Sequence, residues 1–278
     1  MQYINFNGNI YPEHEPLLPV TNRGFKYGDG FFESMVMFDR KIPLLDYHWS
    51  RLEFTTEYLS GEFPKRLDKE ILMSKVLDLA AVNEAVTNAR VRLQFFRKGK
   101  GLYLPEENGL GYVISMEKIE NTQFECGEGL KAGMRADCYK PIYSFSSLKH
   151  SSALSYVLFA QIADDENWDE LILTNTHAQV SEGIHSNVFI VKDNNLITPD
   201  LESGCVSGVM RTYLLANVND IEEREIEVAE LKEANEILLT NAVKGVQWVK
   251  ELDGKTYGNK KAVELTAFLN THLLKTEG

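Results

Sequence analysis

The stretch Val180-Ser181-Glu182-Gly183-Ile184-His185-Ser186-Asn187-Val188-Phe189 sets an acid and an amide between two strand-like runs. Two interpretations of the acid stay open. Ser181-Glu182-Gly183 has the composition of a surface turn, in which Glu182 is only a solvated residue. Alternatively, Glu182 is a carboxylate that pairs with a ring nitrogen of a bound ligand.

A lysine lies upstream, at the end of Tyr143-Ser144-Phe145-Ser146-Ser147-Leu148-Lys149-His150. Lysines are mostly solvated surface charges, so a lysine taken at random is seldom catalytic. Here an amphipathic helix is predicted over residues 151–164, directly after Lys149. A partly desolvated amine in this setting can lose its proton, form a Schiff base and then serve as an acid–base group.

Two later segments supply groups that suit a phosphate. Ser207-Gly208-Val209-Met210-Arg211 opens a predicted helix, and Leu238-Leu239-Thr240-Asn241-Ala242 follows a predicted strand. Backbone amides at a helix start attract phosphate groups. A Schiff-base lysine, an acid for a pyridine nitrogen and helix-start amides together meet the needs of pyridoxal phosphate.

Hydrophobic periodicity and turn residues give the remaining organisation. Asn7-Gly8 and Asp193-Asn194-Asn195 predict hairpins. Other strands are expected over residues 31–38, 90–96, 112–116, 131–139, 170–174, 188–191, 196–198 and 236–240, and other helices over 44–59, 67–82, 207–217 and 260–274. So many hairpins do not suit a doubly wound parallel sheet, and two α+β domains with mixed sheets flanked by helices fit better.

The predicted domains are a smaller N-terminal domain over residues 1–118, a polar linker over 119–128 and a larger C-terminal domain over 129–278. The chain has 278 residues, of which 44% are hydrophobic and 25% are charged, as in ordinary globular proteins. Its net charge of −12 argues against binding to nucleic acid or to an anionic membrane.

Other sequence features concern location and metals. The first residues show no secretory signal, and no apolar run approaches the length of a membrane span. Cys126, Cys138 and Cys205 have neither a metal-binding nor a disulfide pattern, so no metal site is predicted. We therefore expect a cytoplasmic protein with reduced thiols.

From about residue 21 to about residue 250, these segments in this order resemble the class IV aminotransferase family, the fold type IV pyridoxal phosphate enzymes. The resemblance implies that Lys149 forms the Schiff base. It also implies that Glu182 holds the pyridine nitrogen, with Asn187 in a structural role five residues later. A carboxylate there keeps the ring protonated and improves it as an electron sink.

The resemblance also implies which residues bind the phosphate of the cofactor. Gly208, Val209 and Met210 match the family's phosphate loop, and Thr240 matches a hydroxyl that contacts the phosphate. Arg51 matches the phosphate arginine, although from its own surroundings it would be read as a surface residue of a helix.

Fewer residues indicate which reaction of the family the protein catalyses. Branched-chain aminotransferases carry a tyrosine five residues after the lysine, where this chain has Leu154. Met210 is typical of aminodeoxychorismate lyases, which eliminate pyruvate to give 4-aminobenzoate for folate synthesis. That lyase is the leading hypothesis. A branched-chain or D-amino-acid aminotransferase is the alternative, and a binding protein that has lost catalysis is the third.

Substrate contacts are expected near the loop over residues 97–111. Arg97 and Lys100 on it would hold carboxylates, unless the loop is only a solvated basic hairpin tip. Lys100 lacks the bidentate fork of the arginine that the lyase pattern has there. Tyr27 is a further candidate, beside Gly28-Asp29-Gly30, which also matches the family near its site. Members of the family are usually homodimers, so this loop is expected to serve the neighbouring subunit.

Overall fold

A computed structural model describes residues 1–274 of the chain. The chain forms two compact units. The first contains residues 1–122 together with Lys149–Ala153, and the second contains residues 123–148 together with the chain from Leu154 onward. The boundary after Thr122 lies inside the predicted linker. The short segment from Lys149, by contrast, packs with the first unit although it lies in the predicted C-terminal domain.

The first unit is an antiparallel sheet with helices. Its strand order is β2-β1-β5-β4-β3. The strands are β1 (Tyr3–Phe6), β2 (Asn9–Pro12), β3 (Gly30–Met37), β4 (Ala89–Arg97) and β5 (Leu110–Lys118), and the helices are α1 (Arg23–Tyr27), α2 (Leu45–Tyr58) and α3 (Lys69–Val82). The predicted N-terminal hairpin is confirmed, and its turn residues Asn7 and Gly8 take φ values of 50° and 94°.

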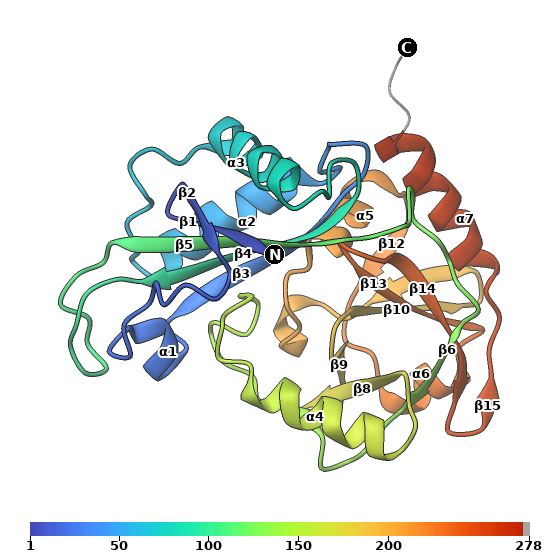
Figure 1. The fold of residues 1–278 in the computed structure, drawn as a ribbon. Helices are drawn as coiled ribbons and strands as arrows, with labels where there is room; N and C mark the ends of the chain where they lie inside the picture. The colour runs from blue at the N-terminus through green and yellow to red at the C-terminus, as the bar shows by residue number, and fades with distance from the viewer. Residues whose placement is uncertain (275–278) are drawn as a thin grey trace. The chain divides into compact units, whose positions relative to one another are not determined.

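The two faces of this sheet differ in character. Phe31, Met35 and Phe95 belong to the hydrophobic core of this unit. Helices α2 and α3 lie over this side of the sheet in Figure 1. Side chains alternate along a strand, so Phe32 and the two polar residues Arg92 and Gln94 of β4 lie on the opposite face. That opposite face also carries the contact of Lys149 with Phe32.

The segment from Lys149 pairs with the edge strand β3. The Phe32 amide donates to the Lys149 carbonyl at 3.1 Å, and the Ser151 amide donates to the Gly30 carbonyl at 2.9 Å. These bonds keep Ser151 extended. The helix predicted from residue 151 therefore begins three residues later, as α4 (Leu154–Asp165).

The second unit is built on a mixed sheet. Its strands are β6 (Leu130–Gly133), β7 (Tyr139–Lys140), β8 (Glu170–Asn175), β9 (Val180–Gly183), β10 (Asn187–Lys192), β11 (Asn195–Thr198), β12 (Ile221–Glu223), β13 (Glu236–Asn241), β14 (Gly245–Leu252) and β15 (Lys255–Thr256). Pairing runs from β10 through β13, β14, β6, β8 and β9 back to β10, so six strands close a ring. The ring encloses an aliphatic core that includes Ile172, Val188 and Ile237.

Helices flank this sheet, as expected for an α+β fold. They are α4, α5 (Val209–Asn217), α6 (Val228–Glu233) and α7 (Lys260–Leu269), with a 3₁₀ turn at Leu201–Ser203 and a π-helical turn at Asn270–Leu274. In Figure 1 α7 runs beside β14, and the two elements are in contact. Among residues 1–274, no helix is both long and apolar enough to cross a membrane.

Two local predictions need correction. The strand predicted over residues 131–139 is interrupted: β6 ends at Gly133, and β7 begins only at Tyr139. Residues 180–183, which the turn interpretation placed on the surface, form β9, and all four are buried. Glu182 is therefore not a surface turn residue.

Candidate functional site

Three polar side chains form one row across the sheet of the second unit. Asn187 of β10 lies opposite Glu182 of β9 on one side and opposite Thr240 of β13 on the other. Directly paired residues point to the same face of a sheet. All three are at most 5% exposed. Since neighbouring strands lie about 4.8 Å apart, the row spans roughly 10 Å.

Glu182 is held by three donors. Its Oε1 accepts from Lys140 Nζ and from the Tyr156 hydroxyl, both at 2.6 Å, and its Oε2 accepts from the Val206 amide at 2.7 Å. A carboxylate has about four acceptor positions. The known bonds therefore leave about one position for a further donor.

The surroundings of Glu182 keep its neighbours in defined protonation states. Burial, together with the negative charge of Glu182, raises the pKa of Tyr156 far above its usual range, so Tyr156 donates as a neutral phenol. Burial likewise raises the pKa of the Cys205 thiol to about 12. The positive charge beside Glu182 thus comes from Lys140, whose side chain is 12% exposed.

The same row fixes the start of α5. The Asn187 amide group donates to the Val206 carbonyl at 2.8 Å, while the Val206 amide donates to Glu182. A Cβ on Gly208 would lie 1.8 Å from Asn187 Oδ1, so only glycine fits there. Gly208 is the N-cap of α5 and supplies no side-chain cap. The amides of Val209 and Met210 therefore stand where a helix start attracts an anion.

Thr240 has an unsatisfied hydroxyl. Its Oγ1 is buried without a hydrogen-bond partner, which is costly unless a bound group supplies one. By contrast Thr198, equally buried, donates to the Val188 carbonyl at 2.8 Å. An acceptor or donor bound beside the row would satisfy Thr240.

A buried acid supports the turn that follows Glu182. Glu170 accepts from the Ile184 amide at 2.8 Å and from the Ser186 hydroxyl at 3.1 Å. Burial raises the pKa of Glu170. These bonds fix the β9–β10 turn, and with it the spacing between Glu182 and Asn187.

In the first unit, Lys149 lies against an aromatic ring that a second cation also contacts. Lys149 Nζ lies 4.6 Å from the centroid of the Phe32 ring, and the Arg92 guanidinium lies 3.8 Å from it. Arg92 also donates to Gln94 Oε1 at 2.8 Å. Within residues 1–274 we find no ion pair between Arg92 and a carboxylate. An amine and an unneutralised guanidinium on one face suit a substrate that carries both an amine and a carboxylate.

Arg51 is bound to an acid of the same unit. Its Nε and Nη2 donate to the two oxygens of Glu33 at 2.7 and 2.5 Å, and His48 Nδ1 lies 2.6 Å from Glu33 Oε2. Burial alone would raise the pKa of Glu33, but the charge of Arg51 and the hydrogen bonds lower it to about 2. Burial lowers the pKa of His48, which therefore donates as a neutral imidazole.

The candidate substrate residues differ in exposure and in the hydrogen bonds that their side chains already make. Arg97 is buried and donates to Asp29, Asn108 and the Leu59 carbonyl. Lys100 is exposed, and Tyr27 is half-buried. The ring of Tyr27 lies 5.6 Å from that of Tyr103. Of the two candidate cations Arg97 and Lys100, Lys100 is the exposed one; substrate roles for Arg97, Lys100 and Tyr27 stay predictions.

The sequence interpretation missed four residues of these clusters: Glu33, Arg92, Lys140 and Tyr156. Two of them had a readable signal. Glu33 is an acid inside the apolar strand predicted over residues 31–38, and Tyr156 lies on the predicted helix after Lys149. Lys140 had none, because its partner Glu182 is 42 residues away in the chain.

Comparison with known proteins gives a consistent picture. The model of the family described as "Amino-transferase class IV" matches residues 30–252. The chain is 28% identical over 273 residues to an aminodeoxychorismate lyase of Bacillus subtilis (strain 168), covering 95% of this chain and 91% of that protein. It is also 28% identical over 269 residues to a putative branched-chain-amino-acid aminotransferase of Methanocaldococcus jannaschii, covering 95% and 92%.

Among solved structures, the 4-amino-4-deoxychorismate lyase of Pseudomonas aeruginosa superposes with a TM-score of 0.79 at 28% identity, covering 94% of this chain and 97% of that one. The fold is therefore that of the fold type IV enzymes. These enzymes use pyridoxal 5'-phosphate, and structural neighbours include an aminotransferase from Mycobacterium tuberculosis in a form with this cofactor bound. The unsatisfied Thr240 hydroxyl, the glycine-lined start of α5 and the open acceptor position of Glu182 all fit that cofactor.

Proposed function

Because this chain belongs to the class IV aminotransferase family, we propose that it is a pyridoxal phosphate-dependent aminodeoxychorismate lyase, which eliminates pyruvate to leave 4-aminobenzoate. The observation that carries the cofactor assignment is the row Glu182, Asn187 and Thr240, which ends at an unsatisfied hydroxyl. Two residues favour the lyase: Leu154 lies where branched-chain aminotransferases carry tyrosine, and Met210 is typical of the lyases.

Each residue of the site would have a defined part. The amides of Val209 and Met210 and the Thr240 hydroxyl would hold the phosphate, together with Arg51, while Glu182 would hold the ring nitrogen. Gly208 would contribute by leaving room beside them, since its own amide donates to the Val206 carbonyl at 2.8 Å. When bound, the cofactor supplies a carbonyl carbon for the amine and a ring that accepts electrons. Lys149 would carry the cofactor between turnovers.

Lys149 would also move the protons of the reaction. Freed by the substrate amine, it removes the proton from the amine-bearing carbon. The bond between the neighbouring ring carbon and the ether oxygen then breaks, and the enolpyruvyl group leaves. That group takes up one proton at its methylene carbon to become pyruvate, and the six-membered ring becomes aromatic. Atoms balance without water or an oxidant.

A substrate carboxylate needs a cation near the reacting amine. Arg92 is the candidate in the first unit, because it shares the face of Phe32 with Lys149. Its guanidinium can bind a carboxylate through two parallel hydrogen bonds. Lys100, on the exposed loop, is a second candidate, with only a point charge to offer.

The alternative is an aminotransferase acting on branched-chain or D-amino acids. It is supported by the 28% identity to the putative branched-chain enzyme, which equals the identity to the lyase. The two reactions share the first proton transfer, so the parts assigned to Lys149 and Glu182 hold for both. They differ in where the proton is returned.

We also infer a cytoplasmic homodimer, in keeping with the family resemblance. The exposed apolar side chains Leu154, Val157 and Leu158 on α4 support an assembly, since such residues seldom gather on a monomer surface. Light scattering on the purified protein should give twice the mass of 31.6 kDa. A mass of one chain across the micromolar range would rule the dimer out.

The experiment that decides the activity uses the cofactor-loaded protein. Release of pyruvate and 4-aminobenzoate from aminodeoxychorismate, in equal amounts and without a keto acid, would establish the lyase. Conversion of the cofactor to its amine form by a branched-chain or D-amino acid, reversed by a keto acid, would establish the aminotransferase instead. A protein that binds no cofactor would refute both.

A further inference from the structure

We propose that Lys140 and Tyr156 act as positioning residues that hold Glu182 as an anion, so that the proton shared with the cofactor stays on the ring nitrogen. The inference rests on the proposed function, because it needs the pyridine ring beside Glu182. It adds two residues to the machinery, and neither of them touches the cofactor in this account.

The geometry singles out one oxygen. Lys140 Nζ and the Tyr156 hydroxyl both contact Oε1 of Glu182 at 2.6 Å. Lys140 also donates to the Ser146 carbonyl at 3.2 Å, and its Nζ lies 5.8 Å from the centre of the Tyr156 ring. The lysine is thus held in place by three separate contacts, as a fixed charge must be if it is to act on a neighbour.

The partners of Glu182 come from separate segments. Lys140 belongs to the two-residue strand β7, Tyr156 to α4, and the Val206 amide to the loop before α5. An exposed ion pair such as Lys192 with Glu233 joins only two side chains at the surface. Bringing three segments to one buried carboxylate is costly in chain entropy, which suggests a function for the arrangement.

The physical consequence concerns the position of one proton. A carboxylate and a pyridine that share a hydrogen bond hold a single proton between them. A cation in contact with the carboxylate lowers the proton affinity of the carboxylate more than that of the more distant ring. The proton then resides on the ring nitrogen, where it makes the ring a better electron acceptor.

Other titratable groups do not supply this charge. The groups of the second unit that interact with Glu182, within the described residues, are Lys140, Tyr156 and Cys205. The phenol and the thiol are neutral in the physiological range, since both have raised pKa values. Lys140 is therefore the only cation of this set.

The test follows the visible absorption of the bound cofactor as the pH is changed. The visible band changes as the Schiff base loses its proton, and the pH midpoint of this change is the measured quantity. A proton on the ring nitrogen lowers this midpoint, because the cofactor then carries one more positive charge. K140M is expected to raise the midpoint by about one pH unit or more, and Y156F by less. K140R keeps the charge, so its pH midpoint is expected to equal that of the wild type.

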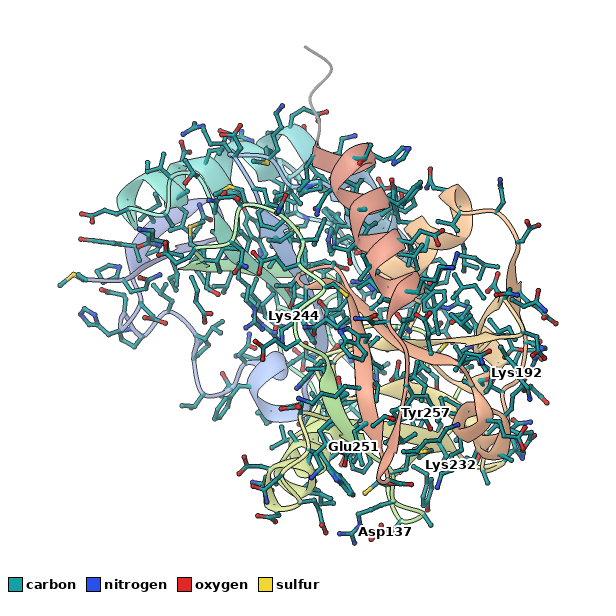
Figure 2. The ribbon with its side chains drawn as sticks, turned by 90° about the vertical axis from the view of Figure 1, so that its right-hand side faces the viewer. Asp137, Lys192, Lys232, Lys244, Glu251 and Tyr257 are labelled. Atoms are coloured by element: carbon teal, nitrogen blue, oxygen red, sulfur yellow. The ribbon has the colours of Figure 1, made fainter. Side chains whose placement is uncertain are left out.

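A cofactor analogue whose ring nitrogen is replaced by carbon gives the decisive control. With it, K140M and the wild type should have midpoints that agree within a few tenths of a pH unit, on the order of a weak long-range charge effect. K192M is the matched surface control. Lys192 forms an exposed ion pair with Glu233 at 3.2 Å and points away from the ribbon in Figure 2.

The outcomes separate the two proposals. The role of Lys140 would be overturned if K140M and the wild type had equal pH midpoints with the natural cofactor. It would also be overturned if K140M shifted the midpoint equally with both cofactors. Neither result would touch the proposed function. If K140M does not fold or bind, K140R and Y156F decide: an unchanged Y156F midpoint or a shifted K140R midpoint counts against the proposal. Absence of the visible band from the wild type would overturn the proposed function instead.

Discussion

Two of the buried glutamates, Glu33 and Glu182, have the same kind of partners and different surroundings. Glu33 in the first unit and Glu182 in the second each accept three hydrogen bonds, and each is paired with one cation. The partners of Glu33 both come from α2, which already packs on β3. Those of Glu182 come from three separate segments.

The difference indicates two kinds of task. The cluster around Glu33 joins one helix to one strand, so it stabilises the packing of the first unit and orients Arg51. The cluster around Glu182 lies in a row with the unsatisfied Thr240 hydroxyl and the open start of α5. A buried carboxylate therefore indicates chemistry only when its neighbours are left incomplete.

The substitution E33Q should produce the largest effect, and it should be on stability. Replacing the acid leaves the buried Arg51 without its counter-charge, which costs about 3–5 kcal/mol. Urea unfolding measures it. Turnover at saturating cofactor, well below the unfolding temperature, should stay within about tenfold of the wild type. A stability loss under 1 kcal/mol would show that Glu33 is not structural.

The loss of stability at low pH should depend on the same cluster around Glu33. The pKa of Glu33 is about 2 in the folded protein, against 4.5 for the ordinary group. Because the folded value is the lower one, the stabilisation is present above pH 4.5 and is lost as the pH falls towards 2. The loss should be about 3 kcal/mol, and E33Q should lack this part of the pH dependence. Identical acid unfolding of the two proteins would contradict the assignment.

The substitution E182Q should act mainly on turnover. Without the carboxylate, the ring nitrogen loses its anionic partner, and the rate should fall about a hundredfold, equivalent to about 2.7 kcal/mol. Lys140 is partly exposed and can regain water, which limits the loss of stability. Steady-state rates of folded E182Q and E33Q give the comparison. Should E33Q lose more activity than E182Q, the division of tasks between the two acids fails.

Arg92 offers a test on the substrate side. R92M should raise KM for the carboxylate substrate about tenfold or more, while leaving the affinity for the cofactor unchanged. Arg90 on the same strand provides a matched control, since it is more exposed and lies near Glu117. An R90M variant with the larger change in KM would exclude Arg92 as the carboxylate contact.

The smallest expected effect concerns two buried threonines. T240V should weaken cofactor binding about threefold to tenfold, while the cofactor-free protein stays as stable as before or gains stability. T198V, which removes the bond to the Val188 carbonyl, should lower stability by about 1 kcal/mol and leave the cofactor affinity alone. Equal behaviour of the two variants would mean that the Thr240 hydroxyl has no ligand.

Much of the fold was readable from local patterns. The hairpin at Asn7-Gly8, the strand β3 and the helices α2 and α3 follow from turn residues and periodicity within short windows. The errors occur where distant segments decide. Ser151 is extended because it bonds to Gly30, about 120 residues away, although its own neighbours favour a helix.

The site residues were predicted from the family resemblance and not from local patterns. The family resemblance predicted Lys149, Glu182 and Thr240, but it does not carry the residues that support them. Lys140 reaches Glu182 across 42 residues, and Arg51 proves to be bound to an acid that no local pattern links to it. Such contacts depend on tertiary packing, so no periodicity encodes them.

The most direct test of the account is to find the lysine that carries the cofactor. The loaded protein is reduced with borohydride, digested and analysed by mass spectrometry. We expect the modified peptide to contain Lys149, and we expect no modification in K149A. Modification at Lys140, the lysine bound to Glu182, would contradict both the assignment of Lys149 and the supporting role of Lys140.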